Sequence, residues 1–126
     1  MKILGRLVAL ARSARLNRQF REVEGAINLV PFASRPALAT LTMREYANAA
    51  KCGFAHQSCA RAFAQVKSHN PQVHLRGIAL WLVMAYIETR SFNSELHVQL
   101  MNILRLFKEI APTSTTDSGD AQKTVA

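Results

Sequence analysis

The chain has 126 residues, a length that suits one domain with a single hydrophobic core. Hydrophobic residues make up 49% and charged residues 19% of the sequence, a balance that excludes an intrinsically disordered chain. The formal net charge is +8, and residues 1–21 contain Lys and Arg but no Asp or Glu. This charge favours a polyanionic partner, either nucleic acid or an anionic membrane surface. The plain alternative is a solubilising surface charge.

Scarce Gly and Pro, with abundant Ala and Leu, favour an all-α fold. The first predicted helix begins near Lys2, and its early apolar residues share one face: Leu4, Leu7, Val8, Ala11 and Ala14. Further on, the stripe moves to another side with Leu16, Phe20 and Val23. The helix therefore either kinks near Asn17 or buries two faces against different neighbours.

The next helices are predicted from their start and stop signals. A short turn of helix is expected at 36–41, and Thr42 with Glu45 three residues later predicts a capping box for a helix ending near Lys51. Further helices are predicted at 56–69, 73–89 and 92–110, with Asn70-Pro71 breaking the first of these. Residues 1–111 should form a single helical domain, followed by a polar, disordered tail at 112–126.

The segment around Gly53 resembles a helix-turn-helix motif, in which two helices cross at a tight corner. Ala49 would be the crossing residue, Gly53 the turn and Phe54 the first plug, with Cys59 and Ala62 facing the core. The predicted DNA-binding residues are Arg44, Lys51, His56, Gln57, Ser58, Arg61 and Lys67. A second set could contact phosphates: Arg12, Arg15, Arg18 and Arg21. A plain helical hairpin with a solvated basic face is the structural alternative.

The stretch from Gly77 to Ile87 is apolar on all sides but too short to span a bilayer. A helix that is apolar all round is buried on all sides, so we expect a dimer or partner interface as well as a core. The predicted interface residues are Ile78, Trp81, Leu82, Ala85 and Tyr86.

The sequence contains no arrangement of residues typical of an enzyme or a metal site. It lacks a nucleophile–base pair, a carboxylate pair and a glycine-rich phosphate loop, so we expect no catalysis and no cofactor. Cys52, His56 and Cys59 match no common zinc spacing, and buried thiols explain the cysteines more simply. Two cysteines without a secretory signal favour the cytoplasm, with an organellar presequence at residues 1–21 as the alternative.

Two stretches resemble the FlhD family, the small all-α subunit of the flagellar transcriptional activator. These are AINLVPFASRPALATLTMREYANAA, at 26–50, and SHNPQVHLRGIALWLVMA, at 68–85. The resemblance implies an all-α homodimer that joins a second regulatory subunit and activates bacterial transcription. It also implies that a cysteine of this region could link subunits, without indicating whether Cys52 or Cys59 does so.

Together these observations predict a small orthogonal helical bundle with a helix-turn-helix-like element, and the apolar helix at 73–89 predicts a dimer. The expected function is a DNA-binding transcriptional regulator, an activator subunit that works on double-stranded DNA as an oligomer or with a partner subunit. The alternative is a non-enzymatic interaction or adaptor protein whose basic face contacts a protein or a membrane.

Overall fold

A computed structural model describes residues 2–52 and 59–111 of the chain, with the backbone alone described for residues 2–4. Every regular element within these residues is helical, which confirms the predicted all-α fold, and none of these helices is long and apolar enough to cross a membrane. The predicted tail at 112–126 lies outside the described residues. The elements are α1 (Lys2–Leu29), the 3-10 turn η1 (Phe32–Ser34), α2 (Arg35–Lys51), α3 (Cys59–Val66), α4 (Pro71–Thr89) and α5 (Ser94–Ile110).

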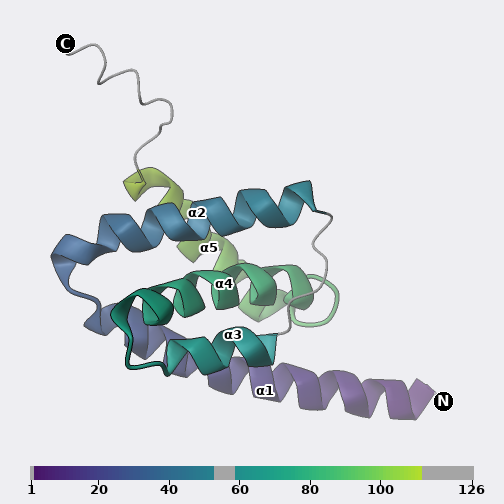
Figure 1. The fold of residues 1–126 in the computed structure, drawn as a ribbon. Coiled ribbons are helices and arrows are strands. Elements are labelled where there is room, and N and C mark those ends of the chain that lie inside the picture. Colours follow the sequence, from purple (N-terminus) through teal and green to yellow (C-terminus); the bar gives the residue numbers. More distant parts are fainter. Residues whose placement is uncertain (1, 53–58, 112–126) are drawn as a thin grey trace, which may run out of the picture.

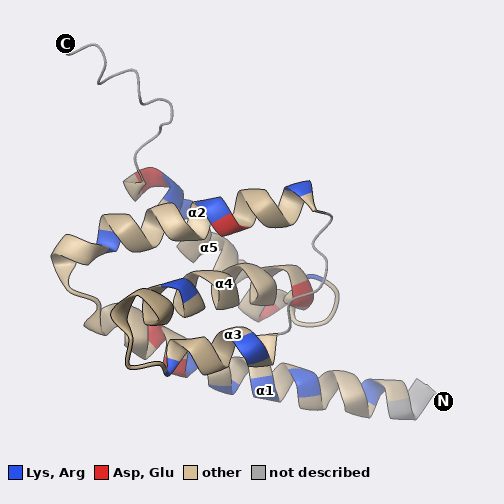
Figure 2. Cartoon of the chain, viewed as in Figure 1, with Lys and Arg blue, Asp and Glu red and all other residues tan. Residues whose placement is uncertain are grey.

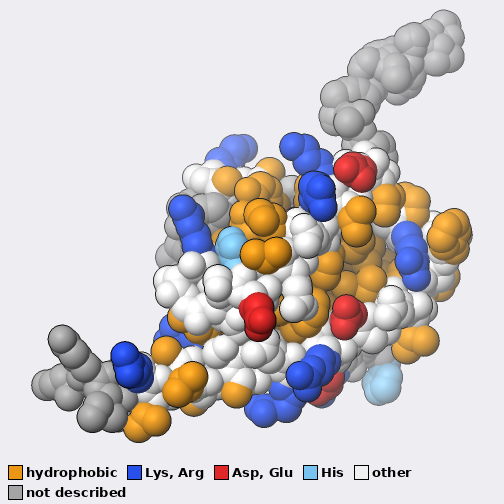
Figure 3. Space-filling model, turned by 180° about the vertical axis from the view of Figure 1, so that it is seen from behind, with side chains coloured by type: hydrophobic (Ala, Val, Ile, Leu, Met, Phe, Trp, Pro, Cys, Tyr) orange, Lys and Arg blue, Asp and Glu red, His pale blue; other side chains and the backbone are white. Residues whose placement is uncertain are grey.

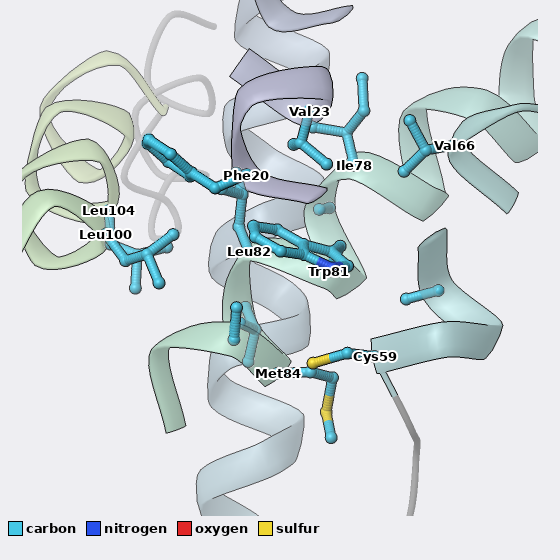
Figure 4. Packing of buried hydrophobic residues seen from close by; sticks show 14 of the residues in the cluster. Phe20, Val23, Cys59, Val66, Ile78, Trp81, Leu82, Met84, Leu100 and Leu104 are labelled. Carbon is cyan, nitrogen blue, oxygen red and sulfur yellow. The ribbon is translucent and has the colours of Figure 1, made fainter. Parts of the chain in front are cut away.

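Helix α4 is the centre of the bundle, and each of the other α-helices packs against it (Figure 1). Trp81, Leu82 and Ile78 have no solvent exposure, and a single cluster of buried side chains draws on all five helices. Figure 4 shows Trp81 and Leu82 next to Phe20 of α1, with Ile78 beside Val23. One core therefore holds the described part of the chain together.

This central position corrects the predicted partner interface on α4. Ile78, Trp81, Leu82 and Ala85 are fully buried within the chain itself, and Tyr86 is only partly exposed. Four helices of the same chain supply the cover that we expected from a second subunit. An apolar helix must be covered on all sides, and α4 is, but the helices that cover it belong to the same chain.

Of the two predicted alternatives for α1, a kink near Asn17 or the burial of two faces, the structure shows one uninterrupted helix over Lys2–Leu29. Its second half uses the predicted second stripe: Leu16 and Val23 are fully buried and Phe20 is 6% exposed. The first stripe faces solvent instead, because Leu7 and Val8 are 57% and 52% exposed and Ala11 and Ala14 are exposed as well. The first half of α1 runs past the end of the bundle and away from its core (Figure 1).

Helix α2 corrects the predicted capping box at Thr42. Thr42 lies inside one helix that begins at Arg35, is fully buried, and donates its hydroxyl to the carbonyl of Leu38 at 2.8 Å. Pro36 permits this early start, because a proline in the first turn of a helix removes an N–H that has no partner there. Threonine bonds back to the preceding turn just as readily as it caps a helix.

Two asparagines fix the starts of α4 and α5. Asn70 accepts hydrogen bonds from the backbone N–H groups of Gln72 and Val73, and α4 begins at the following proline. Asn93 caps α5 by accepting from the N–H of Leu96, and its own amide lies against Ser13 and Asn17 of α1. The loop between α4 and α5 is thereby tied to the middle of α1.

Candidate nucleic-acid interface

The predicted helix-turn-helix corner is not confirmed by the packing of α2 and α3. Each of these helices packs extensively on α4, and α4 lies between them in the bundle (Figure 1). Cys59 and Ala62 face the core as predicted, being 6% and 0% exposed. Residues 53–58, including the predicted turn and the contacts His56, Gln57 and Ser58, lie outside the described residues.

The described members of the predicted DNA-binding set fall on two separate parts of the bundle. Arg44 and Lys51 are exposed on α2, whereas Arg61 is exposed on α3 and Lys67 directly follows it. Because α4 separates α2 from α3, these side chains do not form one continuous surface. These residues are close together in the sequence, which suggested that they share one surface. The packing of the helices places them on two.

A basic surface instead forms where α1 packs beside α3. Figure 2 shows Lys and Arg positions of α3 next to those in the middle of α1, and the two helices are in contact. Lys67 Nζ lies 3.1 Å from Glu22 Oε1 across this contact, and 4.7 Å from the centre of the Phe63 ring. We define the α1–α3 basic surface by its exposed cations: Arg15, Arg18, Arg61 and Lys67.

The arginines of α1 do not all belong to this surface. A step of three residues turns the direction of a side chain by about 300°, so Arg12 and Arg21 point about 180° apart. The Arg12 guanidinium lies 5.4 Å from the centre of the Phe92 ring, which places it beside the α4–α5 loop. Arg21 is exposed on the opposite side of α1 from Arg12, and we leave both residues out of the α1–α3 surface.

A second basic pair lies on the other side of α4. Arg44 of α2 and Arg76 of α4 border a groove of about 510 Å³, which is lined by Ala37, Thr40, Leu41, Arg44, Gln72, Leu75 and Arg76. The sequence did not suggest this pairing, because Arg76 was not among the predicted contacts. Because the positive charge of this groove lies on the other side of α4, substitutions at Arg44 and Arg76 can serve as controls for substitutions in the α1–α3 surface.

Cys59, the first residue of α3, is a buried thiol and not an exposed ligand. Its Sγ lies 3.7 Å from Glu88 Oε1 of α4, to which the thiol can donate. Burial, then the charge of Glu88 and this hydrogen bond, raise the pKa of the Cys59 thiol to about 12, while the nearby Arg15 opposes the rise. Cys52 is exposed. Within residues 2–52 and 59–111, no three His, Cys, Asp or Glu side chains could hold a metal ion together.

We expect the buried thiol to make stability fall at alkaline pH. The pKa of Cys59 is higher in the folded chain than its ordinary value of 9.0, so the stabilisation is fully present below pH 9. Between pH 9 and 12 the unfolded thiol ionises while the folded one keeps its proton, and the free energy of unfolding should drop by about 1 kcal/mol per pH unit. Urea unfolding from pH 8 to 10.5 measures this slope.

Cys59→Ala is the control for that measurement, because every other ionisable group is present in both proteins and its contribution cancels in the difference. The variant should start less stable at pH 8 but lose less stability as the pH rises. Equal slopes in the two proteins would show that the thiol ionises as readily in the folded chain as in the unfolded one.

Comparison of the chain with protein-family models, with curated proteins and with solved structures found no match.

Proposed function

We propose that this chain is a non-enzymatic, DNA-binding regulator of transcription that contacts double-stranded DNA through the α1–α3 basic surface. The observation that carries the proposal is the gathering of exposed arginines from α1 and α3 on one side of the bundle. The predicted helix-turn-helix is not needed for this mode of contact. The resemblance to the FlhD family supports a role in the cytoplasm as an activator subunit, within a homodimer or with a second subunit.

The chemistry of the surface suits phosphate contacts. An arginine guanidinium presents several N–H donors in a planar fork that matches phosphate oxygens, and it stays charged at every physiological pH. Phosphate contacts supply most of the affinity of non-specific DNA binding, and they position a protein without reading its sequence. Glu22 neutralises part of the charge of Lys67, so Lys67 is expected to contribute less to the attraction of DNA than its full charge would.

Removing charge from this surface should weaken DNA binding and flatten its salt dependence. For the wild-type chain, the plot of log affinity against log salt concentration should have a slope of about −4, from about four released counterions. Arg15→Gln/Arg18→Gln/Arg61→Gln should bring that slope to about −1 to −2, because each lost phosphate contact removes about 0.9. Fluorescence anisotropy with a labelled duplex, at several salt concentrations, measures both slopes.

The charge-matched control is Arg44→Gln/Lys51→Gln/Arg76→Gln, which removes as much positive charge from the other side of α4. If the control and the test variant lose affinity equally, net charge alone attracts the DNA and the α1–α3 surface has no special role. If the control loses more, the DNA lies against α2 and the proposal is wrong. Single Arg61→Ala on duplexes of different sequence then separates the two kinds of contact. A base contact costs about 1–3 kcal/mol on preferred sequences only, whereas a phosphate contact weakens all sequences alike.

The uncovered first half of α1 favours a second candidate function, an interaction protein without DNA contact. Leu7, Val8 and Leu10 are more than half exposed, and Arg6 and Arg12 lie among them. A helix with apolar residues and arginines exposed together can lie on an anionic membrane surface. Sedimentation with vesicles of phosphatidylcholine, with and without phosphatidylglycerol, distinguishes the candidates. Binding to anionic vesicles together with absent DNA binding would favour this function over the first.

A further inference from the structure

A pocket between α2 and α5 lies apart from both basic surfaces described above. It has a volume of about 250 Å³ and is lined by Met43, Tyr46, Tyr86, Met101, Leu104, Arg105 and Lys108. Figure 3 shows apolar side chains gathered on the face of the molecule opposite to that of Figure 1, with Lys and Arg side chains at their border. The proposed DNA contact uses none of these residues.

The size of the pocket restricts what could enter it. A cavity of about 150 Å³ in a protein core is known to hold benzene, and drug-sized ligands occupy about 300–1,000 Å³. A volume of about 250 Å³ therefore accommodates one ring with a short substituent. A larger polycyclic ligand would extend into solvent and leave most of its surface uncovered.

The walls of the pocket suit an aromatic ring. The rings of Tyr46 and Tyr86 lie 6.0 Å apart at an angle of 59°, so they present a tilted aromatic corner. Aromatic rings prefer such offset or tilted partners, and methionine sulfur makes favourable contacts with ring edges. Met43 and Met101 supply thioethers, and the nearly buried Leu104 closes the pocket towards the core.

One wall is held in place by contacts behind it. The Tyr86 ring stacks on His97 with ring centres 4.5 Å apart and an angle of 17°. Nδ1 of His97 donates to the backbone carbonyl of Tyr86 at 2.8 Å, because a carbonyl can only accept. Contacts to both the ring and the backbone therefore hold Tyr86 in place. A ligand would not have to restrict the motion of this side chain on binding.

The charge at the pocket is positive and has no acidic counterpart in the lining. Arg105 and Lys108 are three residues apart on α5 and therefore point to the same side of the helix. One nitrogen of Arg105 donates to Asn102 Oδ1 at 3.3 Å, which leaves its other N–H donors available. Lys108 forms no ion pair within the described residues. A carboxylate is the small anion that such a pair of cations would bind beside an apolar wall.

We propose that the α2–α5 pocket binds a small aromatic carboxylate, with its ring against Tyr46 and Tyr86 and its carboxylate towards Arg105 and Lys108. The ligand is of the single-ring class, such as a phenylacetate. This inference does not depend on the DNA-binding proposal, since it involves other residues on another side of the bundle.

The test is a calorimetric titration of the full chain with phenylacetate and with its neutral counterpart, phenylacetamide. We expect saturable 1:1 binding of phenylacetate that is at least about tenfold tighter than that of phenylacetamide, because charged hydrogen bonds are lost in the amide. Acetate, which has the charge but no ring, should bind at least about tenfold more weakly than phenylacetate. Equal affinities for the acid and the amide would overturn the assignment of a carboxylate.

Three variants localise the binding. Arg105→Gln/Lys108→Gln should remove the preference for the acid, whereas Arg44→Gln/Arg76→Gln, which removes the same charge elsewhere, should keep it. Met101→Trp fills the pocket from a position that is 44% exposed, so the fold should tolerate it, and all ligand binding should disappear. Binding that survives Met101→Trp would place the ligand elsewhere and overturn the proposal.

The oligomeric state provides the remaining decisive outcome. Tyr, Met and Arg are also enriched at protein–protein interfaces. If sedimentation shows a wild-type dimer that Met101→Trp converts to a monomer, and phenylacetate does not bind, the pocket is an interface between copies and the ligand proposal is wrong. Saturable ligand binding with an unchanged oligomeric state supports the proposal.

Discussion

Trp81→Ala is expected to lower the free energy of unfolding by about 3–5 kcal/mol, the largest effect of any single substitution that we predict. Trp81 has no solvent exposure, and its ring lies 6.3 Å from that of Phe20 at an angle of 28°. Its indole N–H donates to Gln19 Oε1 at 2.9 Å, so the same side chain joins α4 to α1 by packing and by a hydrogen bond. The free energy of unfolding of a small domain is about 5–15 kcal/mol in total, so this loss is a large fraction of the stability of the chain.

Urea unfolding followed by circular dichroism measures this loss, since the variant no longer contains the only tryptophan of the chain. Two controls divide the effect between its causes. Trp81→Phe keeps a ring in the core and should recover part of the stability. Gln19→Met keeps the shape of its side chain but removes the acceptor, which should cost about 1–3 kcal/mol through the unpaired indole N–H. A Trp81→Ala protein as stable as Gln19→Met would contradict the central place of this ring in the core.

Gly77→Ala should be the second most damaging change, although it adds only one methyl group. A Cβ at Gly77 would lie 2.5 Å from the backbone nitrogen of Val66 and 2.6 Å from the carbonyl carbon of Gln65. These are backbone atoms of α3, so the clash cannot be relieved by rotating a side chain, and α3 would have to move away from α4. We expect a loss of about 1–3 kcal/mol or more in the free energy of unfolding, as for other overpacked sites. Thermal unfolding followed by Trp81 fluorescence measures it.

Gly25→Ala is the matched control, with the same chemical change in another helix. A Cβ at Gly25 would meet nothing within 4 Å, and the residue is exposed inside α1. Alanine should stabilise this site by about 0.5–1 kcal/mol, because glycine loses more backbone freedom in a helix. The two variants should therefore shift the melting temperature in opposite directions. A Gly77→Ala protein that gains stability like the control would show that α3 and α4 do not approach closely there.

Local signals in the sequence predicted most of the helices well. Asn70-Pro71 was predicted to separate two helices, and it does, although α4 begins at Pro71 and not at 73, because the asparagine caps the helix and the proline fits its first turn. The apolar pattern of α5 and the burial of Cys59 and Ala62 also follow from spacing along one helix. The capping box at Thr42 failed because the same hydroxyl had a competing acceptor in the preceding turn, the carbonyl of Leu38.

The arrangement of the candidate site could not be predicted in this way, because it depends on contacts between distant segments. The contact of Lys67 with Glu22 joins α1 to the end of α3, and no periodicity in either segment indicates it. The partner of Arg44 in the second groove is Arg76, two helices further on. The positive charge of the sequence suggested a polyanionic partner. The packing of the helices shows, in addition, that this charge is divided between two sides of α4.

The central position of α4 has a consequence for the chain as it leaves the ribosome. The second half of α1 is synthesised before α4, to which it is held by the contact between Gln19 and Trp81. These two residues are 62 positions apart in the chain. At about 5–20 residues per second, roughly 3–12 s pass between the synthesis of these two residues. During that interval Leu16, Phe20 and Val23 have no tryptophan to pack against. The nascent chain thus presents a basic helix, apolar on two sides, to whatever first meets it in translation.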